Sequence, residues 1–339
     1  MKAINKKLKV GVIGLGRQSL EDHIPAIKSS PDVDLVGIVE IDKKKLQFFI
    51  KENPSIKAYD NFDNLLKHQK PDFVVIALPH YLHYDIVKKA IKNKIHVLKE
   101  KPFAISLKEV KEIRDLANKN NVQIAVTLQR RFNPVYTTFL QLLDKIGRPF
   151  YIEAKYTFYT DKPNEGWRGR KELAGGGCLI DMGYHIVDLL MWYFGLPDTV
   201  FAEMSCAAKE DVEYDAEDTA QVIFRYETKN VWGSLTVSRV IPPKQEWLNV
   251  YGTRGVIHLE RGLLERYSPA GVLQEKLQRE QSWPSAARDQ IEYFVRVIRG
   301  EKENISGPEF HLNHLAFIEA AYRSNEAHQY IKTRDVLDL

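Results

Sequence analysis

The sequence has few cysteines and no long apolar run. Two cysteines among 339 residues, Cys178 and Cys206, offer no disulfide framework and no metal-ligand spacing. A disulfide-rich secreted domain and a cysteine-based metal centre are therefore excluded, and no metal site is expected. The most apolar stretch, residues 186–196, is interrupted by Asp188 and Gly195. A membrane helix needs about 20 consecutive apolar residues, so no membrane partner is expected.

An excess of one charge sign is also absent. Lys and Arg total 49, Asp and Glu total 45, and the formal net charge is +4. The lysines are scattered among acids, which argues against a nucleic-acid partner. Four lysines in residues 1–9 precede an apolar run that is too short for a signal-peptide core. The composition predicts a soluble, reduced, cytoplasmic protein.

The length of the chain and its hydrophobic pattern indicate two domains. In the first third, short β-branched runs alternate with amphipathic stretches of helical length, a pattern typical of a parallel sheet with crossover helices. The predicted strands are residues 8–13, 34–39, 73–77, 95–98 and 123–127. The predicted helices are residues 23–29, 43–51, 81–93 and 107–120.

After about residue 126 the pattern changes to extended stretches separated by short turns. Residues 229–230 and 254–255 are typical of turns between antiparallel strands. The pattern predicts an α+β domain over residues 126–339, built on a large open antiparallel sheet. Its expected strands are residues 151–158, 200–206, 219–226, 231–239, 247–251 and 256–260, and its expected closing helices are residues 288–299 and 309–326.

A glycine-rich turn joins the first predicted strand to the first helix. Residues 10–19 read Val-Gly-Val-Ile-Gly-Leu-Gly-Arg-Gln-Ser. Gly14 permits the tight turn, Gly16 lets the backbone approach a pyrophosphate, and Ser19 is small enough for close helix–strand packing. Free amides at the start of the helix would hold the phosphates. The α/β fold class is therefore a Rossmann doubly wound parallel sheet over residues 1–125, which binds a dinucleotide.

Glu40 ends the second predicted strand, where an acid binds the hydroxyls of the adenosine ribose. Its charge repels a 2′-phosphate, so NAD is the expected cofactor and NADP the alternative. Lys43, Lys44 and Lys45 follow Glu40. They either weaken this preference or form a solvated helix start.

The tripeptide Glu100-Lys101-Pro102 follows the predicted strand 95–98. In a doubly wound sheet the carboxyl ends of the strands face the ligand crevice, so Lys101 is expected beside the nicotinamide. An ammonium group there would bind a substrate oxygen and stabilise its developing negative charge. A surface lysine in a turn is the alternative interpretation.

Residues 175–188 read Gly-Gly-Gly-Cys-Leu-Ile-Asp-Met-Gly-Tyr-His-Ile-Val-Asp. We expect a flexible glycine run that opens a helix, with Asp181 and His185 four residues apart on one helical face. Imidazole can move a proton near neutral pH, and a neighbouring carboxylate raises its basicity and fixes its tautomer. The alternative is an amphipathic helix with a polar stripe.

In combination, the glycine turn, the Glu-Lys-Pro tripeptide and the Gly-Gly-Gly-x-x-x-Asp-x-x-x-His motif closely resemble the glucose–fructose oxidoreductase/inositol dehydrogenase (Gfo/Idh/MocA) family. The resemblance covers essentially the whole chain. It implies hydride transfer between a nicotinamide and a carbinol carbon of a sugar, cyclitol or related polyol. Carried over, Lys101 polarises the substrate, Asp181 binds and orients it, and His185 is the general acid/base. The departures are slight: Ser19 replaces the last glycine, and Glu40 replaces the more usual aspartate.

The resemblance also implies supporting contacts. Arg130, Arg131 and Asn133 lie at the domain crossover, where family members often bind substrate, although interdomain ion pairing explains the arginine pair equally well. The expected cofactor contacts are Gly14, Gly16, Arg17, Gln18, Glu40, Leu78, Pro79, Glu100 and Lys101. The expected substrate contacts are Lys101, Arg130, Trp167, Arg168, Asp181 and His185.

Three nearby residues are given other interpretations. His83 is read as structural or helix-capping, and Asp188 as a supporting partner of the site or a buried cap. Nothing near Cys178 indicates a reactive thiolate.

These features predict an NAD(P)-dependent dehydrogenase acting on CH–OH donors. One alternative is a non-catalytic dinucleotide- and sugar-binding regulator of the same fold. The presence of Lys101, Asp181 and His185 argues against it, because a regulator has no physical need for a proton-transfer set. Another alternative is a reductase of a non-sugar carbonyl or cyclic diol.

A homodimer or homotetramer is expected through the open sheet of the second domain. Apolar and aromatic residues alternate along residues 151–158 and 231–237. A bare sheet face would leave a large apolar patch, which pairing across a two-fold axis would bury.

Overall fold

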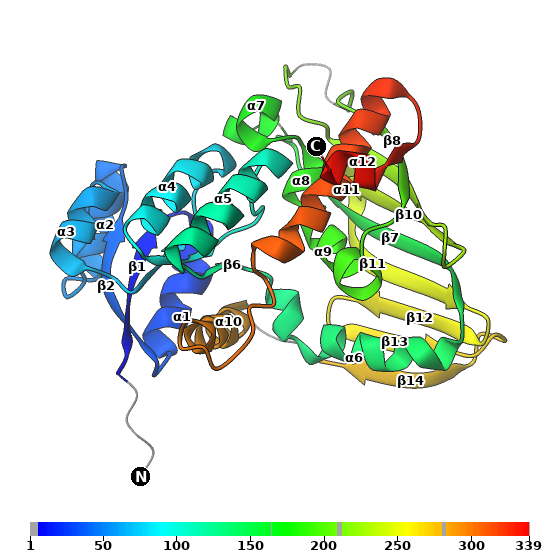
Figure 1. Cartoon of the computed structure of the whole chain (residues 1–339), viewed down its shortest axis with the longest axis horizontal. Helices are drawn as coiled ribbons and strands as arrows, with labels where there is room; N and C mark the ends of the chain where they lie inside the picture. Colours follow the sequence, from blue (N-terminus) through cyan, green and yellow to red (C-terminus); the bar gives the residue numbers. More distant parts are fainter. Residues whose placement is uncertain (1–5, 164, 209–211, 280–282, 339) are drawn as a thin grey trace, which may run out of the picture. The chain divides into compact units, whose positions relative to one another are not determined.

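The chain forms two compact units in a computed structural model that describes residues 6–163, 165–208, 212–279 and 283–338 (Figure 1). The first unit takes in the described residues of 1–103, 109–132 and 281–310. The second unit takes in those of 104–108, 133–280 and 311–339.

The first unit contains a six-stranded sheet in the order β3-β2-β1-β4-β5-β6, with every pair parallel. The strand order reverses between β1 and β4, which is where a doubly wound fold binds its ligand. The predicted Rossmann class is confirmed. The strands are β1 Leu8–Ile13, β2 Val33–Val39, β3 Ala58–Tyr59, β4 Phe73–Ile76, β5 His96–Lys99 and β6 Ile124–Val126.

The helices of this unit follow the prediction closely in α2, α4 and α5. The predicted first helix is preceded by a π-helical turn, η1, in which Ser19 is buried. Helix α3 was not predicted; Asn61 caps it by accepting from the amide of Asn64. The helices are η1 Ser19–His23, α1 Ile24–Ser29, α2 Lys43–Glu52, α3 Phe62–Gln69, α4 His80–Lys92, α5 Leu107–Asn120, η2 Gln129–Phe132 and α10 Trp283–Ile298.

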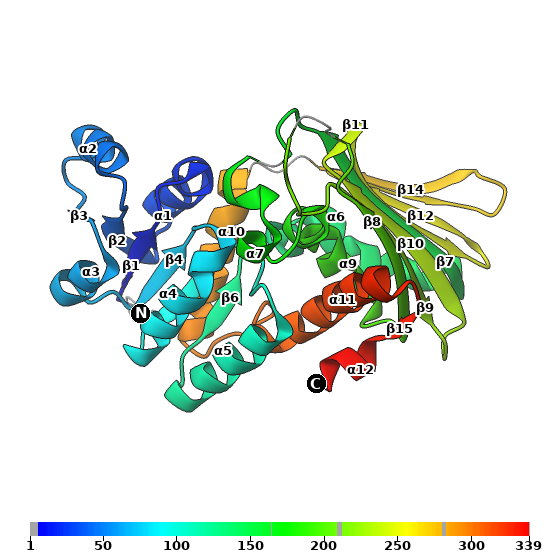
Figure 2. The same ribbon diagram turned by 90° about the horizontal axis from the view of Figure 1, so that it is seen from above.

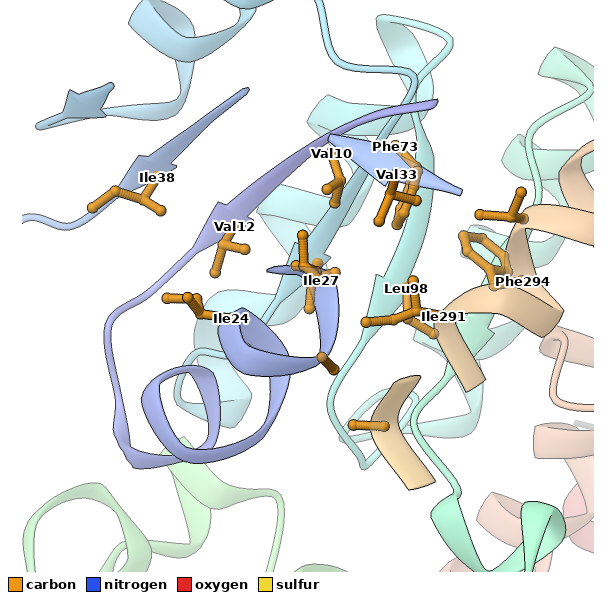
Figure 3. Close-up of a cluster of buried hydrophobic side chains, with 14 of the residues drawn as sticks. Val10, Val12, Ile24, Ile27, Val33, Ile38, Phe73, Leu98, Ile291 and Phe294 are labelled. Carbon is orange, nitrogen blue, oxygen red and sulfur yellow. The ribbon is translucent and has the colours of Figure 1, made fainter. Parts of the chain in front are cut away.

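Helix α10 returns from late in the sequence to complete the core of the first unit. Figure 3 shows its Ile291 and Phe294 among side chains of β1, α1, β4 and β5. The rings of Phe73 and Phe294 meet edge to face, with centroids 5.6 Å apart. The expected boundary at residues 125/126 left this helix in the second domain. The units differ from that division because α10 buries its apolar face against the first sheet.

The second unit contains a nine-stranded sheet in the order β14-β13-β12-β11-β7-β10-β9-β8-β15. The expected antiparallel sheet is mixed, because β7 and β10 pair in parallel. No hairpin joins these two strands, so nothing local imposes an antiparallel sense on them. The strands are β7 Pro149–Tyr159, β8 Thr199–Ser205, β9 Thr219–Tyr226, β10 Val231–Ser238, β11 Val240–Gly252, β12 Gly255–Glu260, β13 Leu263–Tyr267, β14 Leu273–Gln278 and β15 Ile331–Lys332.

Helices cover one face of this sheet. In Figure 2, α9 and α11 run along it. Side chains such as Ile152 on β7 and Leu235 on β10 are buried, while the residues on either side of each are partly exposed. Among the helices of the described residues, none is both long and apolar enough to cross a bilayer. The helices are α6 Pro134–Leu143, η3 Asp144–Ile146, η4 Gly166–Gly169, α7 Lys171–Ala174, α8 Cys178–Asp181, α9 Tyr184–Phe194, α11 Pro308–Ala327 and α12 Thr333–Leu337.

Candidate functional site

The glycine turn after β1 has the geometry that a phosphate site needs. Gly14 has a φ of 96°, and a Cβ atom there would overlap the carbonyl oxygen of Ala77. At Gly16 the nearest atom to an added Cβ is 4.0 Å away, so the space beside it is open. Gly16, Arg17 and Gln18 are successive exposed residues at the start of the first helical turns. The backbone of Gly16 is therefore accessible to an anionic ligand.

Glu40 is tied to this glycine turn. Its carboxylate accepts hydrogen bonds from the amide of Leu15 at 2.8 Å and from the amide of Asp42 at 3.0 Å. The carboxylate thus lies at the end of β2 beside the turn. Asp42 caps α2 by accepting from the amides of Lys44 and Lys45, which supports the interpretation of residues 43–45 as a helix start.

A buried pair connects the first helical turns with the end of β5. His23 Nε2 lies 2.7 Å from Glu100 Oε1, and the His23 side chain is almost wholly buried. Burial raises the pKa of Glu100, but the hydrogen bond from His23 and the positive charges of His23 and Lys101 outweigh it and hold that pKa below its ordinary value. His23 was not predicted as a site residue. Its only local signal is a histidine within an apolar helix start.

The turn after β4 is held from below by His83. Leu78 and Pro79 are partly exposed, whereas His83 is buried and its Nε2 lies 2.8 Å from the carbonyl oxygen of Leu78. Burial and the charge of Lys99 lower the pKa of His83 well below its ordinary value, so the imidazole is neutral. This agrees with a structural role for His83. Lys101 is partly exposed at the end of β5.

In the second unit, the expected single helix after the glycine run is two short helices. Asp181 is the last residue of α8 and His185 the second residue of α9. Met182 and Gly183, between them, keep right-handed helical angles (φ −81°, ψ −38° and φ −61°, ψ −23°). The side chains of Asp181 and His185 therefore still project from the same side of the segment.

Asp181 and His185 are the only residues of 176–191 that are not buried. The other residues of this segment, including Tyr184 and Asp188, are buried. The segment therefore presents one carboxylate and one imidazole to its surroundings.

Arg168 and Trp167 join this pair. Arg168 Nε lies 3.1 Å from Asp181 Oδ2, and the Arg168 guanidinium lies 4.4 Å from the centroid of the Trp167 ring. Arg168, one of the expected substrate contacts, thus binds the carboxylate of Asp181, another of them. An indole face, a guanidinium and a carboxylate together suit the C–H and hydroxyl groups of a polyol.

The glycine run before α8 is closely packed rather than flexible, which corrects the expectation. An added Cβ at Gly175 would clash with Ile105, at Gly176 with Tyr322, and at Gly177 with the backbone of Glu217. Gly175 and Gly176 also have positive φ values. The glycines are therefore needed so that three other segments can approach the backbone.

Glu217 caps α8 from the residues preceding β9. Its buried carboxylate accepts from the amides of Gly177 at 2.6 Å and Leu179 at 3.0 Å, and from the Tyr322 hydroxyl at 3.0 Å. Burial raises the pKa of Glu217, although these hydrogen bonds oppose the rise. Glu217 was not predicted, because an acid 40 positions away from the motif carries no local signal.

Helix α9 is fastened to α11 by a buried polar network. Asp188 Oδ1 lies 2.9 Å from His314 Nε2, and the Tyr184 hydroxyl lies 2.7 Å from His311 Nδ1. All four side chains are at most 1% exposed. Asp188 is therefore buried, in line with its interpretation as a supporting residue. The two histidines of α11 were not predicted.

The residues at the crossover have structural contacts. Arg131 donates to the carbonyl of Ile305, and its guanidinium lies 5.5 Å from the centroid of the Phe310 ring. Asn133 caps α6 by accepting from the amide of Val135 at 2.9 Å. These contacts account for Arg131 and Asn133 without a substrate. Arg130 is also buried, and its role as a substrate contact stays a prediction.

The described residues contain no group of three or more His, Cys, Asp or Glu side chains arranged to hold a metal ion. The predicted cofactor turns and Lys101 belong to the first unit, while Trp167, Arg168, Asp181 and His185 belong to the second. Each unit thus contains some of the predicted functional residues.

Two family models match the chain, one in its first part and one in its second. Residues 8–128 match the model of the oxidoreductase family with an NAD-binding Rossmann fold, and residues 140–258 match the GFO/IDH/MocA C-terminal domain. Trans-1,2-dihydrobenzene-1,2-diol dehydrogenase of Xenopus laevis is 28% identical over 273 residues, covering 78% of each chain. D-glucoside 3-dehydrogenase of Escherichia coli is 28% identical over 195 residues, covering 56% of this chain and 55% of that protein.

A solved structure shows the same fold. The WlbA dehydrogenase of Bordetella pertussis, crystallised with NADH and UDP-GlcNAcA, superposes with a TM-score of 0.82 at 23% identity over 96% of this chain and 99% of that one. The two family matches together span most of the chain, in the same order as its two units. The protein therefore belongs to the GFO/IDH/MocA family of oxidoreductases.

Proposed function

We propose that the protein is an NAD(P)-dependent dehydrogenase that transfers a hydride between the nicotinamide and a CH–OH or carbonyl carbon of a sugar, cyclitol or related polyol. The observation that carries the proposal is the position of Asp181 and His185, which alone are partly exposed among residues 176–191. A carboxylate and an imidazole on one surface form a proton-transfer set. A protein that only bound a dinucleotide would not need one.

The first unit would hold the cofactor. The glycine turn offers backbone amides to the pyrophosphate, and the Glu40 carboxylate lies beside that turn, within reach of ribose hydroxyls. Bound nicotinamide would supply the hydride acceptor. We propose NAD as the preferred form, because the Glu40 carboxylate repels a 2′-phosphate.

The residues of this chain would divide the remaining work. His185 accepts the proton of the substrate hydroxyl during oxidation and returns it during reduction. Asp181 binds a neighbouring hydroxyl and orients the ring, and Arg168 restricts the position of the Asp181 carboxylate. Lys101 donates a hydrogen bond to the reacting oxygen and stabilises its negative charge.

A cyclic diol is the second candidate substrate class. The relative from Xenopus laevis is named for a dihydrobenzene diol and the one from Escherichia coli for a glucoside. Both names denote hydroxyl-bearing rings. The face of Trp167 suits the C–H groups of either class, so we extend the proposal to cyclic diols.

We also propose that the open face of the nine-stranded sheet pairs with a second copy of the chain. Tyr151 lies between Trp232 and Tyr251 on this sheet, with ring centroids 4.5 Å and 5.6 Å away, and Trp232 is 50% exposed. An aromatic row of this kind is a frequent interface centre. Light scattering should give a dimer or tetramer at micromolar concentration, and a monomer would contradict the proposal.

The experiment that tests the catalytic proposal is a panel of sugars, cyclitols and cyclic diols, each with NAD and with NADP, followed by the absorbance of reduced nicotinamide. We expect turnover of at least one ring alcohol, with NAD preferred. If the protein binds NAD by calorimetry but oxidises and reduces nothing in the panel, the non-catalytic regulator becomes the better account.

A further inference from the structure

Lys99, the last residue of β5, is a lysine with 0% of its surface exposed. Its Nζ donates to the carbonyl oxygens of Glu100 at 2.9 Å, Pro102 at 2.5 Å and Phe103 at 3.0 Å. An ammonium group has three donors and no acceptor, so these three carbonyls satisfy it completely. Lysine is rarely buried without such full pairing.

The three acceptors all belong to the turn that contains Lys101. Since they lie on residues 100, 102 and 103, the turn closes around the Lys99 ammonium. Nζ also lies 5.7 Å from the centroid of the Phe103 ring, within the range of a cation–π contact. The backbone on both sides of Lys101 is thus bound to one buried cation.

The surroundings of Lys99 act on its charge in opposite directions. Burial lowers the pKa of Lys99 to about 7, and the charges of Glu100 and Glu109 oppose that decrease. His83 on α4 is a buried base nearby, and burial and the charge of Lys99 lower its pKa well below its ordinary value. His83 binds the carbonyl of Leu78, so the same buried cluster supports the turn after β4.

We propose that Lys99 is a positioning residue for Lys101: the hydrogen bonds from its buried side-chain nitrogen hold the turn of residues 100–103 in the conformation that presents Lys101 to the substrate oxygen. The inference rests on the proposed role of Lys101 in polarising the substrate. It assigns a function to a lysine that would otherwise be regarded only as the last residue of β5.

The test compares Lys99→Met with Lys101→Ala, the double variant and Leu98→Ala. Methionine keeps the length of the side chain and removes the charge and all three donors. Misplacing a catalytic group by about 1 Å can cost about 10²-fold in rate. We therefore expect kcat to fall about 10- to 100-fold in Lys99→Met, while the NAD dissociation constant stays within about threefold.

The matched control separates positioning from general stability. Leu98 is buried on the same strand, so Leu98→Ala should lower the melting temperature and leave kcat within about twofold of native. The double variant should be no slower than Lys101→Ala, because a misplaced side chain cannot be lost twice. If Lys99→Met retains native kcat while Lys101→Ala loses it, or if the two losses multiply, the positioning role is wrong.

A second readout does not depend on turnover. Hydrogen–deuterium exchange of a peptide covering residues 99–106 should be faster in Lys99→Met than in native protein, and unchanged relative to the rest of the chain in Leu98→Ala. If no substrate is turned over by any form, the proposed function fails, and exchange still decides whether Lys99 holds the turn. Unchanged exchange in Lys99→Met would overturn the inference.

Discussion

The two segments that carry the predicted chemistry are held from beneath by charges of opposite sign. In the first unit, the turn after β5 points three carbonyl oxygens inward, and they meet the buried ammonium of Lys99. In the second unit, the start of α8 points amides inward, and they meet the buried carboxylate of Glu217. An irregular backbone must satisfy its polar groups, and the sign of the supporting side chain follows from which groups face the interior.

The partly exposed functional residues therefore depend on buried residues that hold their backbone and do not themselves contact a ligand. Lys101 is partly exposed on a turn closed around a cation, while Asp181 and His185 are partly exposed on a segment capped by an anion. Variants of the exposed residues should change turnover, and variants of the buried ones should change stability as well.

The largest expected effect is on turnover. His185→Ala should lower kcat about 10²- to 10⁴-fold, because the substrate hydroxyl loses its general base. The NAD dissociation constant should stay near its native value, since the glycine turn lies in the other unit. Steady-state kinetics with the best substrate of the panel, together with calorimetry for NAD, measures both quantities.

His328→Ala is the matched control, because His328 is exposed on the surface of the same unit. It should have native turnover. Full rate in His185→Ala would identify another group as the base, with Lys101 the first candidate.

The buried carboxylate of Glu217 should contribute strongly to stability. Glu217→Ala leaves the amides of Gly177 and Leu179 and the Tyr322 hydroxyl without their acceptor, and we expect the free energy of unfolding to fall by about 2–4 kcal/mol. Glu217→Gln keeps one acceptor oxygen and should lose less. Urea unfolding measures this, with the exposed Glu227→Ala as control. Equal stability of Glu217→Ala and Glu227→Ala would show that Glu217 does not stabilise the start of α8.

The buried side chain of Lys99 should make the free energy of unfolding depend on pH. The folded-state pKa of Lys99 is lowered to about 7, below its unfolded value of about 10.4. Between these values the unfolded chain binds one more proton, so the stability rises with pH. The native protein should gain about 1.4 kcal/mol per pH unit relative to Lys99→Met within this range. Urea unfolding of both proteins at about pH 7.5, 8.5 and 9.5 tests this. If the free energies of unfolding of the native protein and of Lys99→Met change equally with pH, the prediction is wrong.

The smallest expected effect concerns the cofactor. Glu40→Ser removes the carboxylate that lies beside the glycine turn and should reduce the preference for NAD over NADP by about tenfold, roughly 1.4 kcal/mol. Dissociation constants for both cofactors in native and variant protein measure it. Tighter binding of NADP by the native protein would show that Lys43, Lys44 and Lys45 outweigh Glu40.

The sequence predicted the parts of this arrangement that have a local pattern. The bounds of β1, β9 and α5 follow from hydrophobic periodicity. The glycine turn and the Asp181–His185 pair follow from spacing. The parallel pairing of β7 with β10 was not predicted, because strand sense without a hairpin is decided by the rest of the sheet.

The supporting residues were missed for a related reason. Lys99 directly precedes the Glu-Lys-Pro tripeptide and looks like one more charge at the end of a strand, so its burial cannot be predicted from its neighbours. Glu217 and His314 meet α8 and α9 only after some 40 and 126 residues of intervening chain have folded. Their partners are set by tertiary packing, for which a single sequence holds no local signal.

The return of α10 to the first unit has a consequence for synthesis. A nascent chain that has emerged as far as residue 132 contains all six strands of the first sheet and the glycine turn. It still lacks Ile291 and Phe294, so the apolar side chains of α1, β1 and β4 that pack against them are uncovered. The cofactor-binding unit is therefore completed only after α10, which ends at Ile298, has left the ribosome. Until then, the interior of the first unit is a surface for chaperones to protect.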